Sequence, residues 1–297
     1  MLEEYGIPYT LIYIDEITAS KYLSEGKRPV PGYQRVFLGD VFSVEMKMVA
    51  ASCAADGAAL VYLDDGNSMI QTLKHNDTGL FSKRLFQING FNWRFWRHRA
   101  TRYLKLSKYC FQHKLFIHQN FFTIFPDLVP SKAYSYSNRL NLLRSRYNCG
   151  LSNDVMFIGC PVRILCGRTG IDENLLYSKL AQKLADIKAE YPGCRMMYIP
   201  HGRESDERAD EICKSLGIEY RPISEAIEFY AVRNHIAPCC IYGINSTALL
   251  TLKTILPQAN VTNIIVGEKG NAFHHFLEEV ADYYSTKGIA KEVLHID

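Results

Sequence analysis

The sequence predicts an α/β protein with mainly parallel strands, divided into two domains. Both halves repeat the order of short apolar run, turn and helix-like pattern, which is typical of layered α/β folds. The chain has 297 residues, more than one hydrophobic core usually organises, so two domains are expected. Hydrophobic residues make up 47% and charged residues 22% of the chain, which is enough apolar material for two cores.

The first half contains a short series of alternating elements. A helix is expected over residues 44–55, because Ser43 precedes it as a capping residue. Apolar runs predict three strands, at residues 9–14, 35–38 and 58–63. Residues 120–153 have the least regular pattern and are expected to join the domains, which we assign as 1–145 and 146–297.

The second half begins with the most regular helical pattern in the chain. Residues 172–190 are expected to form a helix, because four apolar residues recur at helical spacing: Leu176, Leu180, Leu184 and Ile187. Strands are predicted at residues 154–158, 194–199, 218–220, 239–242 and 264–266. Shorter helices are predicted at residues 204–216, 225–234 and from 247 to just before Pro257.

Basic residues are concentrated in one segment. The formal net charge is +3, but residues 78–153 contain thirteen Lys or Arg and a single acidic residue, Asp127. This imbalance favours an anionic partner. Within the segment, residues 92–109 interleave cations with four aromatic residues, Trp93, Phe95, Trp96 and Tyr103. A solvated helix with aromatic residues in the core, a peripheral membrane contact and a track for an anionic glycan are the alternatives. Nucleic acid ranks last, because no known binding motif accompanies the charge.

Cysteine usage and hydropathy favour a cytoplasmic protein. The nine cysteines include no CxxC pair, and several lie in apolar runs as small core residues. The N-terminal residues lack the basic and apolar regions of a signal peptide, and no run of 18 apolar residues occurs. We therefore expect neither secretion through such a peptide nor a membrane-spanning segment.

Three polar motifs directly follow predicted strands, at the edge where ligands of parallel sheets bind. They are Asp64-Asp65-Gly66, Pro200-His201-Gly202-Arg203-Glu204 and Gly243-Ile244-Asn245-Ser246-Thr247. Adjacent carboxylates raise the pKa of one of them, which is a way to obtain a general base. Asp64 and Asp65 point to opposite faces of an extended strand, so only one would reach a cleft. A metal-binding pair or a simple Asp-Gly turn are the alternatives.

The other two motifs suit an anionic group. His201 and Arg203 place a proton donor and a cation in one loop, although a loop histidine is more often structural. Glu204 would favourably begin the next helix. Ser246 and Thr247 fall at a helix start, which either holds a phosphate or is merely capped. Together the motifs suit an inverting transfer from a nucleotide sugar, in which a carboxylate deprotonates the acceptor and the leaving phosphate is stabilised.

The three motifs, in their order and spacing, resemble those of bacterial sialyltransferases, and most closely the polysialyltransferase group. The runs RVFLGD before the first motif and AIEFYAVRNHIAPCCIYGINSTALLTL around the third are similar as well. The resemblance covers roughly residues 35–70 and 154–266. It implies a GT-B fold, in which two Rossmann-like domains face a central cleft. It also implies CMP-sialic acid as donor, inversion at the anomeric carbon, and no metal or other cofactor.

The resemblance also implies roles for individual residues. Asp65 would be the general base, with Asp64 and Gly66 shaping its loop. His201 would be the acid or hydrogen-bond donor to the CMP phosphate. The remaining substrate-binding residues would be Gly202, Arg203, Glu204, Glu228, Ser246 and Thr247, of which the last two would bind the phosphate and Glu228 the ribose or cytosine.

Two departures from the family pattern stand out. The family usually has proline where this chain has Gly202, which loosens the backbone beside the histidine. A strand expected before about residue 5 is also missing, so the chain is either truncated or starts upstream.

The expected acceptor is a capsular polysaccharide or lipooligosaccharide glycan, itself an anionic chain in one alternative. Transfer of another CMP-activated acidic sugar such as Kdo, or an inactive nucleotide-binding module of capsule assembly on the inner face of the plasma membrane, are the alternatives.

Overall fold

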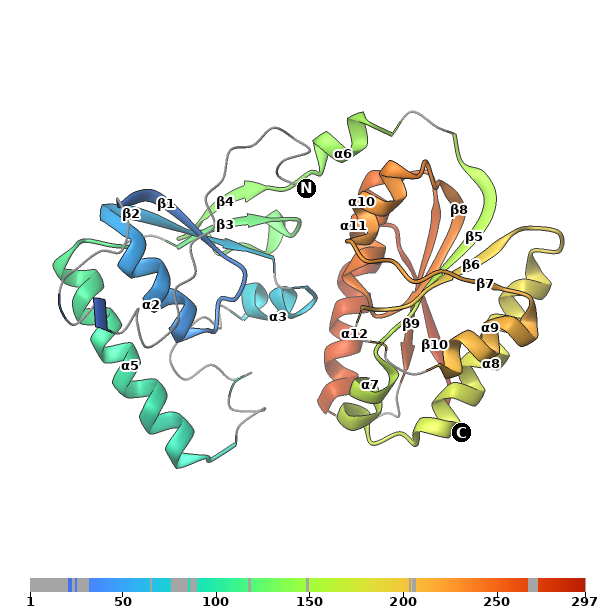
Figure 1. Cartoon of the computed structure of the whole chain (residues 1–297), viewed down its shortest axis with the longest axis horizontal. Helices are drawn as coiled ribbons and strands as arrows, with labels where there is room; N and C mark the ends of the chain where they lie inside the picture. Colours follow the sequence, from blue (N-terminus) through green and yellow to red (C-terminus); the bar gives the residue numbers. More distant parts are fainter. Residues whose placement is uncertain are drawn as a thin grey trace. The chain divides into compact units, whose positions relative to one another are not determined.

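The chain forms two compact units, Met1–Ser137 and Asn138–Asp297, each built around one sheet in which every strand pair is parallel (Figure 1). The predicted α/β class is therefore confirmed. The arrangement of the two units about a cleft stays a prediction. The computed structural model describes residues 21–22, 25, 32–64, 66–75, 85, 90–116, 119–147, 150–202, 204, 207–266 and 272–296.

The first unit contains a four-stranded sheet in the order β1-β2-β3-β4. Its strands are β1 (Tyr33–Leu38), β2 (Ala54–Leu63), β3 (Gln119–Thr123) and β4 (Tyr134–Ser137). Its helices are α2 (Val44–Cys53), α3 (Ser68–Lys74), α5 (Trp93–Gln112) and the 3₁₀ turn η2 (Pro126–Leu128). The strand predicted at residues 9–14 lies outside the described residues.

The N-terminus of α2 is as expected, but its C-terminus is not. The hydroxyl of Ser43 accepts a hydrogen bond from the amide of Met46 at 3.0 Å, which is an N-cap. The helix ends at Cys53 rather than at residue 55, because the chain turns directly into β2 at the buried Ala54. The strand therefore begins four residues before the predicted residue 58.

The expected join at residues 120–153 contains the boundary between the two units, which falls after Ser137, but the segment is more regular than expected. It contains β4 and nearly all of β3, followed by α6 (Asn141–Ser145). The strand β4 was not predicted, because its alternating sequence Tyr-Ser-Tyr-Ser is only four residues long and all four are exposed at a sheet edge. The helix α6 belongs to the second unit, whereas the predicted boundary after residue 145 leaves it in the first domain.

The second unit contains a six-stranded sheet in the order β10-β9-β8-β5-β6-β7. The strands are β5 (Ser152–Ile158), β6 (Met196–Ile199), β7 (Glu219–Tyr220), β8 (Pro238–Ile244), β9 (Asn260–Val266) and β10 (Ala290–Leu294). From β5 at the centre, the chain runs through β6 to β7, then returns to the other side of β5 and continues through β8 and β9 to β10. This is the doubly wound, Rossmann-like order, whose direction reverses between β5 and β8.

Helices cover both faces of this sheet. They are α7 (Val162–Thr169), α8 (Glu173–Glu190), α9 (Arg208–Leu216), α10 (Ile227–Arg233), α11 (Thr247–Ile255) and α12 (Ala272–Ser285). Figure 1 shows α8 and α9 on one face, and α11 and α12 on the other. The predicted apolar stripe of α8 is confirmed, because Leu176, Leu180, Leu184 and Ile187 are all buried. We did not predict α7, α12 or β10.

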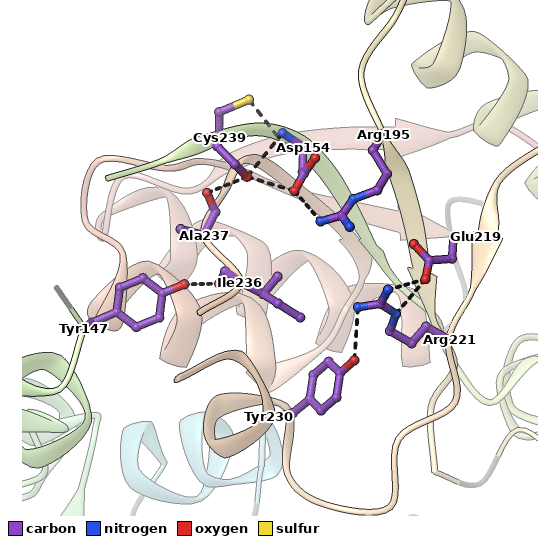
Figure 2. A network of polar contacts seen from close by, with 10 residues as sticks. Tyr147, Asp154, Arg195, Glu219, Arg221, Tyr230, Ile236, Ala237 and Cys239 are labelled. Atoms are coloured by element: carbon purple, nitrogen blue, oxygen red, sulfur yellow. Dashed lines mark hydrogen bonds and ion pairs between the residues drawn. The ribbon is translucent and has the colours of Figure 1, made fainter. Parts of the chain in front are cut away.

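The amino edge of this sheet is held by an ion pair and backbone bonds (Figure 2). Arg195 Nη2 lies 2.6 Å from Asp154 Oδ2, and the thiol of Cys239 donates to the Asp154 carbonyl. The amide of Ser152 donates to the Ala237 carbonyl at 2.7 Å. These contacts join β5, the residue before β6, and β8. None of the helices in the described segments has both the length and the hydropathy that crossing a bilayer requires.

Candidate functional site

The candidate site of the second unit lies at the carboxyl edge of its sheet, where the strand order reverses. Ile158 of β5 pairs with Ile199 of β6 on one side and with Gly243 of β8 on the other. The loops that follow these strands therefore leave the sheet at one level. Neighbouring strands lie about 4.8 Å apart, so the loops after β6 and β8 are separated by roughly 10 Å. Parallel α/β sheets bind their ligands at such a reversal.

The start of α11 combines a cap with ligand-binding capacity. Ser246 has extended backbone angles, and its hydroxyl accepts a hydrogen bond from the amide of Ala248 at 3.3 Å. Ser246 therefore caps the helix, as one of the two alternatives expects. As the acceptor in this bond, the hydroxyl keeps its own hydrogen for a ligand oxygen. Thr247 is the first helical residue, where backbone N–H groups and the helix dipole favour an anion.

The residue before the cap lies beside a buried amide. Asn245 has a φ of +45°, and its N–H donates to Oδ1 of Asn263 at 2.9 Å. Asn263 is on β9 opposite Gly243 and is fully buried. Within the described part of the chain, its Nδ2 has no hydrogen-bond partner. Buried donors are rarely left unsatisfied, so this amide is a candidate contact for a bound group.

Glu228 lies near the same helix start. Its Oε1 accepts a hydrogen bond of 2.5 Å from the hydroxyl of Thr251. Thr251 follows Thr247 by four residues on α11, so the two side chains lie on one face of the helix, about one turn apart. The structure therefore brings three residues singled out from the sequence, Glu228, Ser246 and Thr247, to one end of α11.

The loop after β6 is held by a glutamate. Glu204 Oε2 accepts a hydrogen bond from the amide of His201 at 3.0 Å, and Oε1 accepts one from the hydroxyl of Tyr198 at 2.8 Å. The amide of Glu204 in turn donates to the His201 carbonyl at 2.7 Å. Both carboxylate oxygens thus bind the protein itself. Glu204 does not begin the next helix as expected, because α9 starts at Arg208.

Tyr198 and Gly159 hold the Glu204 carboxylate in place from the sheet; we call the bonds of this carboxylate to Tyr198 and His201 the Glu204 brace. Burial, and secondly the Glu204 carboxylate, raise the pKa of Tyr198 well above 10, so its hydroxyl is a neutral donor. A Cβ at Gly159 would lie 2.5 Å from both Glu204 Oε2 and the Tyr198 hydroxyl. Only glycine fits there. Neither role was predicted from the sequence, since a tyrosine inside a strand and a glycine after one carry no specific signal.

Gly202 and Arg203 complete the second motif. Gly202 is exposed, its φ is not left-handed, and a Cβ there would meet nothing within 4 Å. The backbone at this position therefore does not require glycine. Arg203 lies outside the described residues.

In the first unit, Asp64 ties the ends of two neighbouring strands together. Its Oδ1 accepts a hydrogen bond of 2.5 Å from the hydroxyl of Thr123, and Oδ2 accepts one of 2.8 Å from the amide of Ile124. Burial raises the pKa of Asp64 above 3.8, and these two bonds oppose the rise. The carboxylate therefore fixes the turn after β2 to the end of β3.

The rest of the first motif is only partly described. Gly66 has a φ of +63°, a conformation that glycine adopts without strain, and its carbonyl accepts the amide of Met69 in the first turn of α3 at 3.1 Å. Asp65 lies outside the described residues, so its role as base and its meeting with His201 stay predictions. Among the described residues, no three His, Cys, Asp or Glu side chains are grouped as a metal site requires.

Comparisons with known proteins give distant structural similarities. No protein-family model and no curated protein matches the sequence. The structure is similar to MurG of Acinetobacter baumannii, with a TM-score of 0.42 and 11% identity over 99% of this chain and 74% of MurG. It is also similar to an α/β-galactoside α-2,3-sialyltransferase of Photobacterium phosphoreum, with a TM-score of 0.44 and 10% identity over 93% of this chain and 82% of that chain. Similarities at this level do not establish an activity.

Proposed function

We propose that the chain is an inverting glycosyltransferase of the GT-B type that transfers sialic acid from CMP-sialic acid to a glycan. The observation that supports it most is the carboxyl edge between β5 and β8, where a doubly wound sheet presents Ser246 and Thr247 at a helix start with Glu228 about one turn away. Such an edge suits a nucleotide phosphate. The choice of CMP-sialic acid comes from the resemblance of the three sequence motifs.

In this proposal, the start of α11 binds the donor phosphate. The hydroxyl of Ser246 and the first N–H groups of the helix donate to phosphate oxygens, and the helix dipole stabilises the charge that grows as CMP departs. Glu228, held by Thr251, has a carboxylate oxygen with which to accept a ribose hydroxyl. His201, in the loop two strands away, protonates or hydrogen-bonds the leaving phosphate.

Asp65 is assigned the role of base partly because its neighbour has another role. Both oxygens of Asp64 accept bonds from the end of β3, which suits a residue that positions the turn. The proposal therefore leaves removal of the acceptor proton to Asp65. Attack by the acceptor oxygen on the anomeric carbon then forms the new glycosidic bond, CMP leaves with the bonding electron pair, and the configuration inverts.

Binding of CMP to the full chain tests the donor site by itself. Titration calorimetry should give a CMP affinity that falls at least tenfold when Ser246 and Thr247 are both changed to alanine, since hydrogen bonds to charged groups contribute roughly 1.5–3 kcal/mol. Thr254→Ala is the matched control, because this threonine lies on the last turn of α11 and bonds the Leu250 carbonyl. Equal CMP affinity in the double variant and the control would contradict the assignment.

Turnover tests the reaction. The protein is incubated with CMP-sialic acid or CMP-Kdo and a panel of lactosyl and oligosialyl acceptors, with and without EDTA, and the products are identified by mass. Asp65→Asn should lose about two to four orders of magnitude in turnover while CMP binding persists. Products from CMP-Kdo alone would replace the sialic acid donor, and CMP binding without any product would favour an inactive module.

A further inference from the structure

The outward face of α5 carries a stripe of large apolar side chains. Trp93, Leu104 and Phe111 are separated by 11 and 7 residues, which at 100° per residue places them within about 20° of one another around the helix. Their exposed fractions are 73%, 70% and 88%, and Phe91 just before the helix is 90% exposed. The stripe is about 27 Å long, since each residue rises about 1.5 Å.

The opposite face of the helix fixes this orientation. Trp96, Arg99, Leu106 and Tyr109 are buried, which confirms that part of the basic, aromatic segment enters the core. Leu106 and Tyr109 pack in one cluster with Val44 and other residues of α2, and Figure 1 shows α5 on the outside of α2. A guanidinium N–H of Arg99 donates to the Phe42 carbonyl at 2.8 Å. Since α5 cannot rotate without breaking these contacts, the stripe faces away from the core of its unit.

Cations flank the stripe on one side. Arg97 and Lys108 lie next to it around the helix, and Arg94 and Lys105 lie one step further. All four are exposed, and none forms an ion pair with another described residue. No acidic residue occurs between Trp93 and Gln112. An apolar stripe bordered by exposed cations is the pattern of a helix that lies in the headgroup region of a bilayer.

We propose that α5 docks this unit on an anionic lipid bilayer, with the stripe in the acyl boundary and the four cations at the headgroups. The inference concerns α5 alone and does not depend on the donor or the reaction. A glycan acceptor explains the cations but not the exposed Leu104 and Phe111, because a hydrated sugar chain gives these side chains no apolar medium to enter. Lipid supplies both the negative charge and the hydrocarbon.

Tryptophan fluorescence provides the first test. The chain has only two tryptophans, of which Trp96 is buried with its indole N–H donating to Gly90, and Trp93 is exposed. Vesicles of phosphatidylcholine and phosphatidylglycerol in equal parts should shift the emission of the full chain to the blue, and pure phosphatidylcholine should do so far less. In Trp93→Phe the shift should disappear while sedimentation with the vesicles persists.

Paired variants provide the second test, by vesicle sedimentation. Arg97→Gln with Lys108→Gln should weaken binding to the anionic vesicles roughly 30-fold, since each cation near such a surface contributes about fivefold. Leu104→Ser with Phe111→Ser should weaken it at least tenfold. The control pair Leu142→Ser and Leu175→Ser removes exposed apolar side chains from the second unit and should leave binding unchanged.

Three outcomes would overturn the proposal. One is the absence of binding to the anionic vesicles. Another is that the α5 variants and the control pair bind the vesicles equally. The third is that the α5 variants lose affinity for soluble oligosialic acid, or lose self-association in sedimentation velocity, while vesicle binding is retained, since the stripe would then serve a glycan or a second copy of the chain.

Discussion

A buried lysine in the first unit gives a prediction that depends only on the fold. Lys47 of α2 is 7% exposed, and its Nζ lies 5.5 Å from the ring centroid of Tyr62. Burial, and secondly the nearby Arg99, lower its pKa from 10.5 to about 8, while Asp40 opposes the change. No described carboxylate forms an ion pair with it. The charged amine of Lys47 therefore lowers the free energy of unfolding of the first unit.

We expect Lys47→Met to stabilise the first unit at about pH 7. The difference between 10.5 and about 8, at roughly 1.4 kcal/mol for each pH unit, corresponds to a penalty of about 3 kcal/mol. Methionine has a similar length and no charge, but the cation–π contact with Tyr62 is lost, which costs about 1 kcal/mol. The net gain in the free energy of unfolding is therefore on the order of 2 kcal/mol.

The stability gained by Lys47→Met depends on pH. The unfolded lysine binds its proton up to about pH 10.5 and the folded one only up to about pH 8, so between these values the unfolded chain binds more protons. Stability of the parent protein then rises with pH through this window, and the advantage of methionine shrinks from about pH 8 to about pH 10. Below this window the advantage is constant.

Urea denaturation followed by tryptophan fluorescence measures this difference, because both tryptophans, Trp93 and Trp96, belong to the first unit. Lys105→Met, which changes an exposed lysine of α5, is the control and should alter stability little at either pH. A stability difference between Lys47→Met and the parent that stays the same from about pH 7 to about pH 10, or a destabilised variant at about pH 7, would refute the reasoning.

Further predictions concern the bonds that hold the site loops. Tyr198→Phe should destabilise the second unit by about 1–3 kcal/mol in urea denaturation followed by circular dichroism, because it leaves an oxygen of Glu204 without its donor; a cost near zero would contradict the brace. Thr123→Val removes a bond that lowers the pKa of Asp64, so carbon-13 NMR should find this carboxyl, already titrating above 3.8, shifted further upward; an unchanged titration would be evidence against the bond. Thr251→Val removes the hydrogen bond that holds the Glu228 carboxylate and should weaken CMP binding several-fold in calorimetry without altering the helix. Equal affinity would mean that Glu228 is not part of the CMP site.

The regular elements of the second unit could be predicted because local pattern and burial agree there. The apolar stripe of α8 is buried where the helical spacing of its residues predicts. The strands β5, β6 and β8 are buried where the apolar runs predict. The strand β4 was missed, because its Tyr-Ser alternation covers only four residues at an exposed sheet edge, where no buried face supports the pattern. The start of α9 was also missed, because the acidic residue expected to begin it, Glu204, folds back onto the loop of His201.

The roles of the acidic residues Glu204 and Asp64 could not be predicted from the sequence, because their hydrogen-bond partners depend on the tertiary structure. The resemblance implies that Glu204 binds substrate, but its partners, the buried Tyr198 and its own loop, are settled only by the tertiary structure. The same holds for Asp64, whose donors are the last residue of β3, Thr123, and the residue after it, Ile124, 59 and 60 residues further along the chain. A sequence motif gives the types of chemical group that are present. The fold determines which of these groups are already hydrogen-bonded to other parts of the protein.

The two occupied carboxylates lead to a test that separates positioning from chemistry. Asp64 directly follows β2 and is bound to the end of β3, while Glu204 holds the loop in which His201 lies. If the proposed roles are correct, Asp64→Asn and Glu204→Gln should reduce stability and turnover together, because they loosen a loop. Asp65→Asn and His201→Gln should reduce turnover more than stability, because the proposal assigns these two side chains to the reaction itself. Measuring both quantities in all four variants therefore distinguishes residues that react from residues that hold them, and equal stability losses in the two pairs would remove the distinction.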